Sequence, residues 1–181
     1  MVLRLVDHQV VTDFIKEWGD LDDRLKGCEI QIREMLKTHE VCRVVDQLQG
    51  IGPITATAMV ATIGNPSVFK NGRQVSSYFG LVPGHKGTGG KIRLKGISKR
   101  GDKYIRKLLV HGGRSMVLHA EKKTDLMSRW ITQLIKKRGF NKACVAVANK
   151  NARMCWAVMK KHSRGEATTI LPPRNIAGAL R

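Results

Sequence analysis

Acidic residues are scarce over most of this 181-residue sequence. Residues 1–49 hold ten of its 14 acidic and seven of its 33 basic side chains, which leaves four acidic and 26 basic ones for residues 50–181. These four are Asp102, Glu121, Asp125 and Glu166. Metal-dependent phosphodiester chemistry generally needs a cluster of acidic oxygen ligands. We therefore expect neither a metal site nor a cofactor in this chain.

Paired cysteines and long apolar runs are also missing. Cys28, Cys42, Cys144 and Cys155 form no CxxC pair, so neither a zinc site nor a disulfide framework is indicated, and we expect core thiols in a reducing cytosol. No stretch of eighteen apolar residues could span a membrane, and the start of the sequence lacks the apolar run of a signal peptide. We expect a soluble, cytoplasmic protein without a membrane partner.

What the sequence has in excess is positive charge. The formal net charge is +19, and it is unevenly placed, because residues 1–49 are net negative while residues 50–181 carry nearly all the basic surplus. A surface of one sign over such a length suits a phosphate backbone. Nucleic acid is therefore the expected partner, and a ribosomal or membrane-surface role is the alternative on charge alone.

The first 36 residues place apolar side chains three or four positions apart. The spacing predicts one helical stripe close to a coiled-coil seam, and hence an arm over residues 1–43 that pairs with another helix. The partner helix comes either from a second copy, which we favour, or from within the chain. The acidic side chains mostly fall off the stripe, as on a solvated helix face. The stripe consists of Leu3, Val6, Val10, Phe14, Trp18, Leu21, Leu25, Cys28, Ile32 and Met35.

A helix, a tight turn and a second helix are expected between Val44 and Gly64. The first helix should end near Leu48, and Pro53 suits the start of the second. Between them, Gly50, Ile51 and Gly52 could expose backbone N–H groups to a DNA phosphate, as in a helix-hairpin-helix element. An ordinary helical hairpin with a glycine cap is the alternative.

A long basic loop is expected next, because six glycines between Gly84 and Asp102 disfavour a continuous helix. It could contain a short strand at 91–94. A basic, glycine-rich loop that feeds a basic helix can follow a DNA backbone closely; a solvated, disordered loop is the alternative. The predicted DNA-binding side chains are Lys86, Lys91, Arg93, Lys95, Lys99, Arg100, Lys103, Arg106 and Lys107.

The remaining pattern is helical. Helices are predicted from Lys103, over 126–138 and over 142–161, followed by a loose tail at 166–181. The fold class is thus mainly α, with a helical arm at 1–43 and a DNA-binding domain at 44–165. The histidines His85, His111 and His119 lack ligand spacing and are expected to be structural.

Three segments in this order resemble the carboxy-terminal domain of the Piv-type insertion-sequence transposases. They are LQGIGPITATAMVATIG, YFGLVPGHKGTGGKIRLKGISKRGDKYIRKLLVHGGR and RGFNKACVAVANKNARMCWAV. The resemblance covers roughly residues 44–160. The helical arm is similar to the coiled coil that joins this domain to a RuvC-like domain in that family.

The resemblance implies a reaction shared between two domains. A DEDD cluster of the RuvC-like domain, with a divalent metal, acts together with a serine just before a glycine in the basic loop, and some members use a structured bridging RNA. The residue at the serine position here is Thr88, whose hydroxyl is the catalytic candidate. We expect the DEDD domain to lie outside these residues and the isolated chain to be inactive alone.

The resemblance thus implies a DNA-binding transposase domain that takes part in transposition and site-specific recombination. It also implies a bacterial, nucleoid-associated protein. A non-catalytic architectural or ribosome-associated nucleic-acid-binding protein is the alternative.

Overall fold

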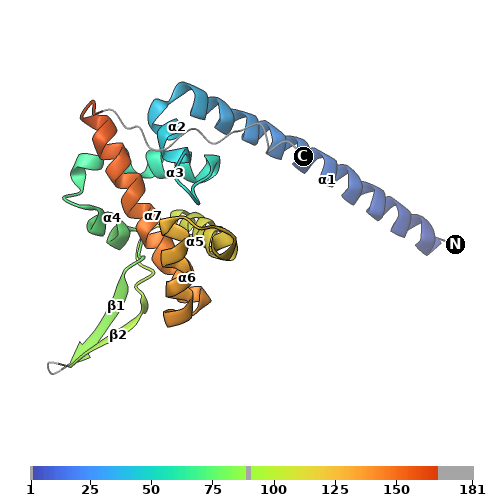
Figure 1. Cartoon of the computed structure of the whole chain (residues 1–181). Coiled ribbons are helices and arrows are strands. Elements are labelled where there is room, and N and C mark those ends of the chain that lie inside the picture. The colour runs from blue at the N-terminus through green and yellow to red at the C-terminus, as the bar shows by residue number, and fades with distance from the viewer. Residues whose placement is uncertain (1, 89–90, 167–181) are drawn as a thin grey trace.

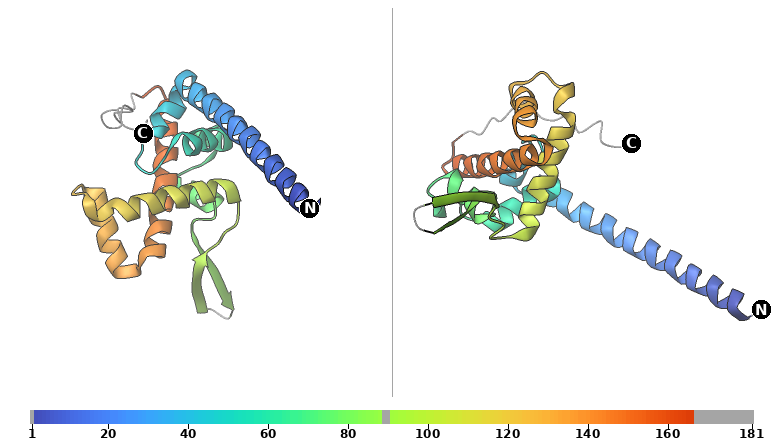
Figure 2. Two further views of the ribbon diagram at one scale, coloured as in Figure 1. Left: turned by 90° about the vertical axis from the view of Figure 1, so that its right-hand side faces the viewer. Right: turned by 90° about the horizontal axis from the view of Figure 1, so that it is seen from below.

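The computed structural model describes residues 2–88 and 91–166 (Figure 1). These residues are mainly helical, as predicted, with one two-stranded sheet. A long helix, α1 (Val2–Thr38), extends from a compact helical body (Figures 1 and 2). The tail predicted for residues 166–181 lies, beyond Glu166, outside the described residues.

The arm is a single uninterrupted helix. Gly19 and Gly27 do not break α1, although glycine weakens a helix by roughly 1 kcal/mol. Its apolar side chains face solvent, and those of Phe14 and Trp18 are 65% and 78% exposed. Near its carboxyl end α1 contacts the body, where Leu36 packs against the core. Among the described side chains, then, most of the apolar stripe from Val10 onward is exposed.

Two helices flank the glycine turn. The first, α2 (Glu40–Asp46), ends two residues before the predicted Leu48, and α3 (Pro53–Ile63) begins at Pro53 as predicted. Gly50 has a φ of +75°, a left-handed conformation that favours glycine. The conformation of the turn therefore depends on glycine at position 50, and the start of α3 on Pro53.

The body is built around α7 (Phe140–Ser163), which is buried along one face. It packs against α5 (Lys103–His119) and α6 (Leu126–Arg138), whose bounds agree with the predicted helices. Asp102 and Asp125 cap α5 and α6 by accepting bonds from backbone N–H groups of the first turn. The shorter elements are η1 (Pro66–Val68), α4 (Gly72–Tyr78) and η2 (Ala120–Lys122).

The long loop predicted for residues 84–102 is largely a β-hairpin, and the short strand predicted at 91–94 lies within its second strand. The chain forms an antiparallel hairpin of β1 (Pro83–Thr88) and β2 (Lys91–Ile97), in which Thr88 pairs with Lys91 and Pro83 with Ile97. The glycines disfavour a helix but do not prevent cross-strand pairing. The period-two alternation of basic and apolar residues in KIRLK is the strand signal that the glycine count obscured.

The prediction of core thiols was correct for three cysteines and wrong for Cys28. Cys42, Cys144 and Cys155 are buried, whereas Cys28 lies exposed on α1. Burial raises the pKa of Cys155 to about 12, because the interior disfavours the thiolate.

Candidate nucleic-acid interface

At the base of the hairpin two backbone segments approach each other closely at two glycines. Gly80 and Gly101 both have positive φ values, +69° and +99°. A Cβ at Gly80 would lie 2.1 Å from the carbonyl oxygen of Arg100, and one at Gly101 would lie 1.8 Å from that of Tyr78. The strands therefore enter and leave the body through a crossing that only glycine permits.

Lys99 lies at this crossing in a left-handed conformation, with φ +55°, the one non-glycine residue with positive φ among the described residues. Its N–H donates to the carbonyl of Gly80 at 3.1 Å, and that of Ser98 donates to Val82 at 2.8 Å. Such backbone strain persists only where its surroundings hold it. The hairpin base thus presents Lys99 and Arg100 in a fixed frame, with both side chains exposed.

The start of α5 continues this basic surface. Asp102 Oδ1 accepts from the N–H groups of Tyr104 and Ile105 at 2.7 and 2.9 Å. Arg106 Nη1 donates to the Phe79 carbonyl at 3.1 Å, so this side chain connects α5 to the end of α4. Lys103 and Lys107 are exposed. Arg106, predicted as a DNA contact, is thus placed as a structural link whose remaining donors stay available.

The structure brings part of the predicted basic set together. Lys95, Lys99, Arg100, Lys103 and Lys107 are exposed around the hairpin base and the first turns of α5. For four further predicted residues the structure describes the backbone but not the side chains. These are Lys86, Thr88, Lys91 and Arg93.

The glycine turn lies further along α5. The Gly50 carbonyl packs against Gly112 of α5. A Cβ at Gly112 would lie 1.9 Å from the Gly50 carbonyl oxygen. Asn151 Nδ2 donates to the Gln49 carbonyl at 3.1 Å and holds the turn against α7. Ile51 is 1% exposed, so its side chain belongs to the core, and its N–H donates to the Leu48 carbonyl at 3.1 Å within the turn. Gly52 stands just before α3, whose first turn faces outward at Ile54.

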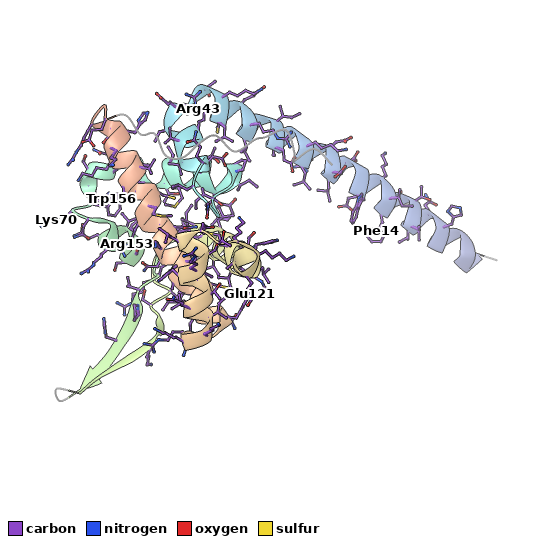
Figure 3. All side chains as sticks on the ribbon, in the orientation of Figure 1. Phe14, Arg43, Lys70, Glu121, Arg153 and Trp156 are labelled. Atoms are coloured by element: carbon purple, nitrogen blue, oxygen red, sulfur yellow. The ribbon has the colours of Figure 1, made fainter. Side chains whose placement is uncertain are left out.

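A groove of about 850 Å³ was not anticipated from the sequence. It runs along α7 between the hairpin base and α6, and its lining includes Lys142, Lys150 and Arg153 together with Trp130 and Trp156. Figure 3 shows Arg153 and Trp156 on the side of α7 that faces α4, away from Glu121. The available signal was the spacing of eight and eleven residues, which places the three basic residues on one face of α7.

Neither a metal cluster nor a membrane-spanning helix is found in the described part of the chain. Among residues 2–88 and 91–166, no group of three or more histidine, cysteine or acidic side chains is placed to hold a metal ion. None of the helices in this part of the chain has the length and apolar character needed to cross a membrane.

The segment that carries the hairpin and α5 matches a known family model. Residues 42–127, which run from α2 to the start of α6 and include the hairpin and α5, match the family model described as "Transposase IS116/IS110/IS902 family". Residues 42–127 are therefore similar to a domain of this transposase family.

Named relatives agree with this assignment. The chain is 41% identical over 140 residues to a "Transposase for insertion sequence element IS1111A" from Coxiella burnetii, covering 77% of this chain and 38% of that protein. It is 39% identical over 155 residues to a "Probable family 20 transposase" from Pseudomonas aeruginosa, covering 86% and 46%. A "Transposase for insertion sequence element IS1328" from Yersinia enterocolitica is 31% identical over 83% of this chain and 45% of its own length. The chain thus spans less than half the length of these relatives.

Proposed function

We propose that this chain is the DNA-binding, carboxy-terminal part of an insertion-sequence transposase and takes part in DNA strand transfer on the bacterial nucleoid. The observation that carries the proposal is the fixed basic surface formed by the hairpin base and the start of α5. Its side chains project from the close approach at Gly80 and Gly101 and from the capped start of α5. The backbone that carries them therefore loses little conformational freedom when they meet a phosphate backbone. The relatives' names support the same role.

The chemistry of strand cleavage would be shared with groups outside residues 50–181. These residues contain only four carboxylates, two of which cap helices, as Asp102 and Asp125 do. An acidic DEDD cluster with a divalent metal, contributed by a RuvC-like domain, would supply the missing ligands. A structured bridging RNA is a further proposed partner of the complete protein.

The salt dependence of binding tests the DNA-binding role. We expect the affinity of the chain for duplex DNA to fall steeply with salt, because each phosphate contact releases counterions. Each phosphate contact contributes about 0.9 to the slope of log K against log salt. The double substitution Lys103→Gln and Lys107→Gln removes two such contacts and should therefore make this slope shallower by about 2. The matched control, Lys122→Gln with Lys136→Gln, removes the same charge from exposed positions elsewhere. A salt-insensitive affinity would contradict the proposal.

Thr88 is the proposed nucleophile within this function. Its backbone ends β1, opposite Lys91. The hydroxyl oxygen would attack a phosphodiester phosphorus and displace one ester oxygen, which leaves as a hydroxyl after receiving the threonine's proton. The product is a phosphothreonine link to DNA. A threonine that bonds the local backbone of the turn is the alternative.

An adduct assay decides between these roles. With the DEDD domain supplied in trans, the parent chain, Thr88→Ser and Thr88→Ala are compared for protein–DNA adducts that survive denaturation. Adducts with threonine or serine but not alanine support the nucleophile. Equal strand transfer by the alanine variant eliminates it, and an adduct with serine alone means that this chain binds DNA without cleaving it. The architectural or ribosome-associated alternative requires that no variant transfers strands.

The arm has a proposed partner of its own, the α1 helix of a second copy. Its stripe has apolar side chains at coiled-coil spacing, and two of them, Phe14 and Trp18, form a shallow apolar hollow with the neighbouring Val11 and Ile15. Pairing two arms would cover this surface and bring two DNA-binding bodies into one particle.

A further inference from the structure

The groove along α7 has a built and connected wall. Asn149 Nδ2 donates to the carbonyl of Leu81 at the hairpin base at 3.1 Å, and Ser76 Oγ of α4 donates to the Asn149 carbonyl at 3.3 Å. Trp156 Nε1 donates to the carbonyl of Pro66 at 2.9 Å. The wall formed by the hairpin base, α4 and η1 is therefore attached to α7 before any ligand enters.

Three basic side chains lie along the groove. Lys142, Lys150 and Arg153 come from one face of α7, and no carboxylate is among the residues that line it, all of which the structure describes. In the part of the chain that the structure describes, none of the three forms an ion pair. The stem of Arg153 passes over Gly72, whose missing side chain leaves room for it. Their charge is therefore available to an anionic ligand.

The same groove presents aromatic and apolar surface between these charges. Trp130 and Trp156 are half-buried, and Lys150 Nζ lies 4.5 Å from the ring centroid of Trp130. Lys160 Nζ lies 5.2 Å from that of Trp156. Leu81, Pro83 and Ile97 of the hairpin base complete an apolar side. Each lysine ammonium thus lies over a tryptophan ring, and a base can stack on that ring only when the lysine moves aside to a phosphate.

This combination selects a class of ligand. A duplex presents its phosphates outward and keeps the faces of its bases stacked, so it has nothing to place against buried tryptophan. A single strand offers phosphates and unstacked bases together, and base–aromatic stacking contributes about 1–3 kcal/mol per base. The volume of about 850 Å³ lies within the roughly 300–1,000 Å³ of typical ligand sites.

We propose that the α7 groove binds a single-stranded nucleic-acid segment, with phosphates at Lys142, Lys150 and Arg153 and an unstacked base against Trp130 or Trp156. The inference rests on the proposed function and deepens it, because a strand must leave its duplex before it is exchanged. The basic surface at the hairpin base holds duplex, and the adjoining groove receives the released strand.

The test uses the full chain carrying Trp18→Phe, which removes the exposed tryptophan of α1 and leaves Trp130 and Trp156 as fluorophores. A thymidine oligonucleotide should change their fluorescence on binding, whereas inorganic polyphosphate, which has charge but no bases, should not. Lys142→Gln combined with Arg153→Gln should weaken single-strand binding about tenfold, with loss of two phosphate contacts. Lys122→Gln with Lys136→Gln is the control and should change it little. A uridine oligonucleotide of equal length shows whether the site prefers RNA or DNA.

Several results would overturn the inference. These are equal weakening by the groove and control pairs, an equal fluorescence change with polyphosphate, or parallel loss of duplex and single-strand affinity in the groove variant. Thermal melting of each variant checks that the fold is intact, and Trp130→Phe, which keeps an aromatic face, should retain most of the binding. If the groove fails while duplex binding keeps its steep salt dependence, the proposed function stands. If duplex binding fails while the groove binds a single strand, the proposed function fails alone.

Discussion

Gly112 and Gly113 are neighbours on α5 that serve two different contacts. A Cβ at Gly112 would lie 1.9 Å from the Gly50 oxygen, and one at Gly113 would lie 2.6 Å from the Cys144 oxygen. One glycine therefore lets the turn approach α5, and the other lets α7 approach it. Glycine costs helix stability, so its presence at both positions indicates that close packing outweighs local propensity.

The substitution Gly112→Ala should destabilise the body by about 2 kcal/mol or more, because a backbone oxygen occupies the space of the new methyl group. Alanine favours a helix more than glycine does, so the sign of the effect isolates the contact with the turn. Denaturant unfolding measures it. Ser115→Ala, at an exposed position of the same helix, should stay within about 0.5 kcal/mol. Equal stability of the two variants would contradict the packing argument.

The four thiols should differ sharply in reactivity. Burial raises the pKa of Cys42, Cys144 and Cys155, so these thiols stay protonated at neutral and mildly alkaline pH, while Cys28 is exposed. With dilute native protein we expect one fast maleimide adduct per chain, and four after unfolding. The variant Cys28→Ser should give none in the native state. Fast labelling of a second thiol would show that the body opens readily.

At the scale of elements, α1 is a helix whose stability must come from elsewhere. A helix gains most of its stability from packing an apolar face, and that face is exposed here. The observed helix agrees with the period of the stripe, but its exposed face still needs a partner helix. The α1 helix of a second copy carries the same stripe and could cover this face.

Charges placed on the stripe should separate the copies. Phe14→Glu combined with Leu21→Glu should weaken self-association by at least about tenfold, because the pairing face would bury two carboxylates. Sedimentation over a range of concentrations measures this. The pair Gln9→Glu and Gln31→Glu adds equal charge at exposed positions off the stripe and should associate like the parent. A parent chain that stays monomeric at high micromolar concentration would reject the dimer.

At the scale of the whole molecule, the arm and the body should unfold separately. Among the described residues α1 contacts the body near its carboxyl end, where Leu36 packs against the core, whereas the body has its own core around α7. We expect a transition of α1 that moves to higher temperature with protein concentration, and a body transition that does not. Circular dichroism follows the first, and the fluorescence of Trp130 and Trp156 in the Trp18→Phe chain follows the second. One concentration-independent transition for both would contradict this division.

Some of this molecule could be predicted from the sequence because the evidence is local. The stripe of α1, the helix start at Pro53 and the bounds of α6 follow from periodicity and end signals that lie within one turn of helix. The excess of basic residues after residue 49 is likewise a property of composition, and it indicated a polyanionic partner before any fold was known.

Other features depend on residues that are distant along the chain, and only the tertiary structure decided them. The hairpin needed pairing between Pro83 and Ile97, which no count of glycines could indicate. The groove joins α7 to the hairpin base through the bond from Asn149 to Leu81, 68 residues apart. Composition shows how much charge a chain carries, but the packing of α5 and α7 determines which charges lie beside which aromatic faces. Because such contacts form only when distant segments meet, the sequence by itself determined the helices and the excess of positive charge, and the fold decided which basic and aromatic side chains lie together.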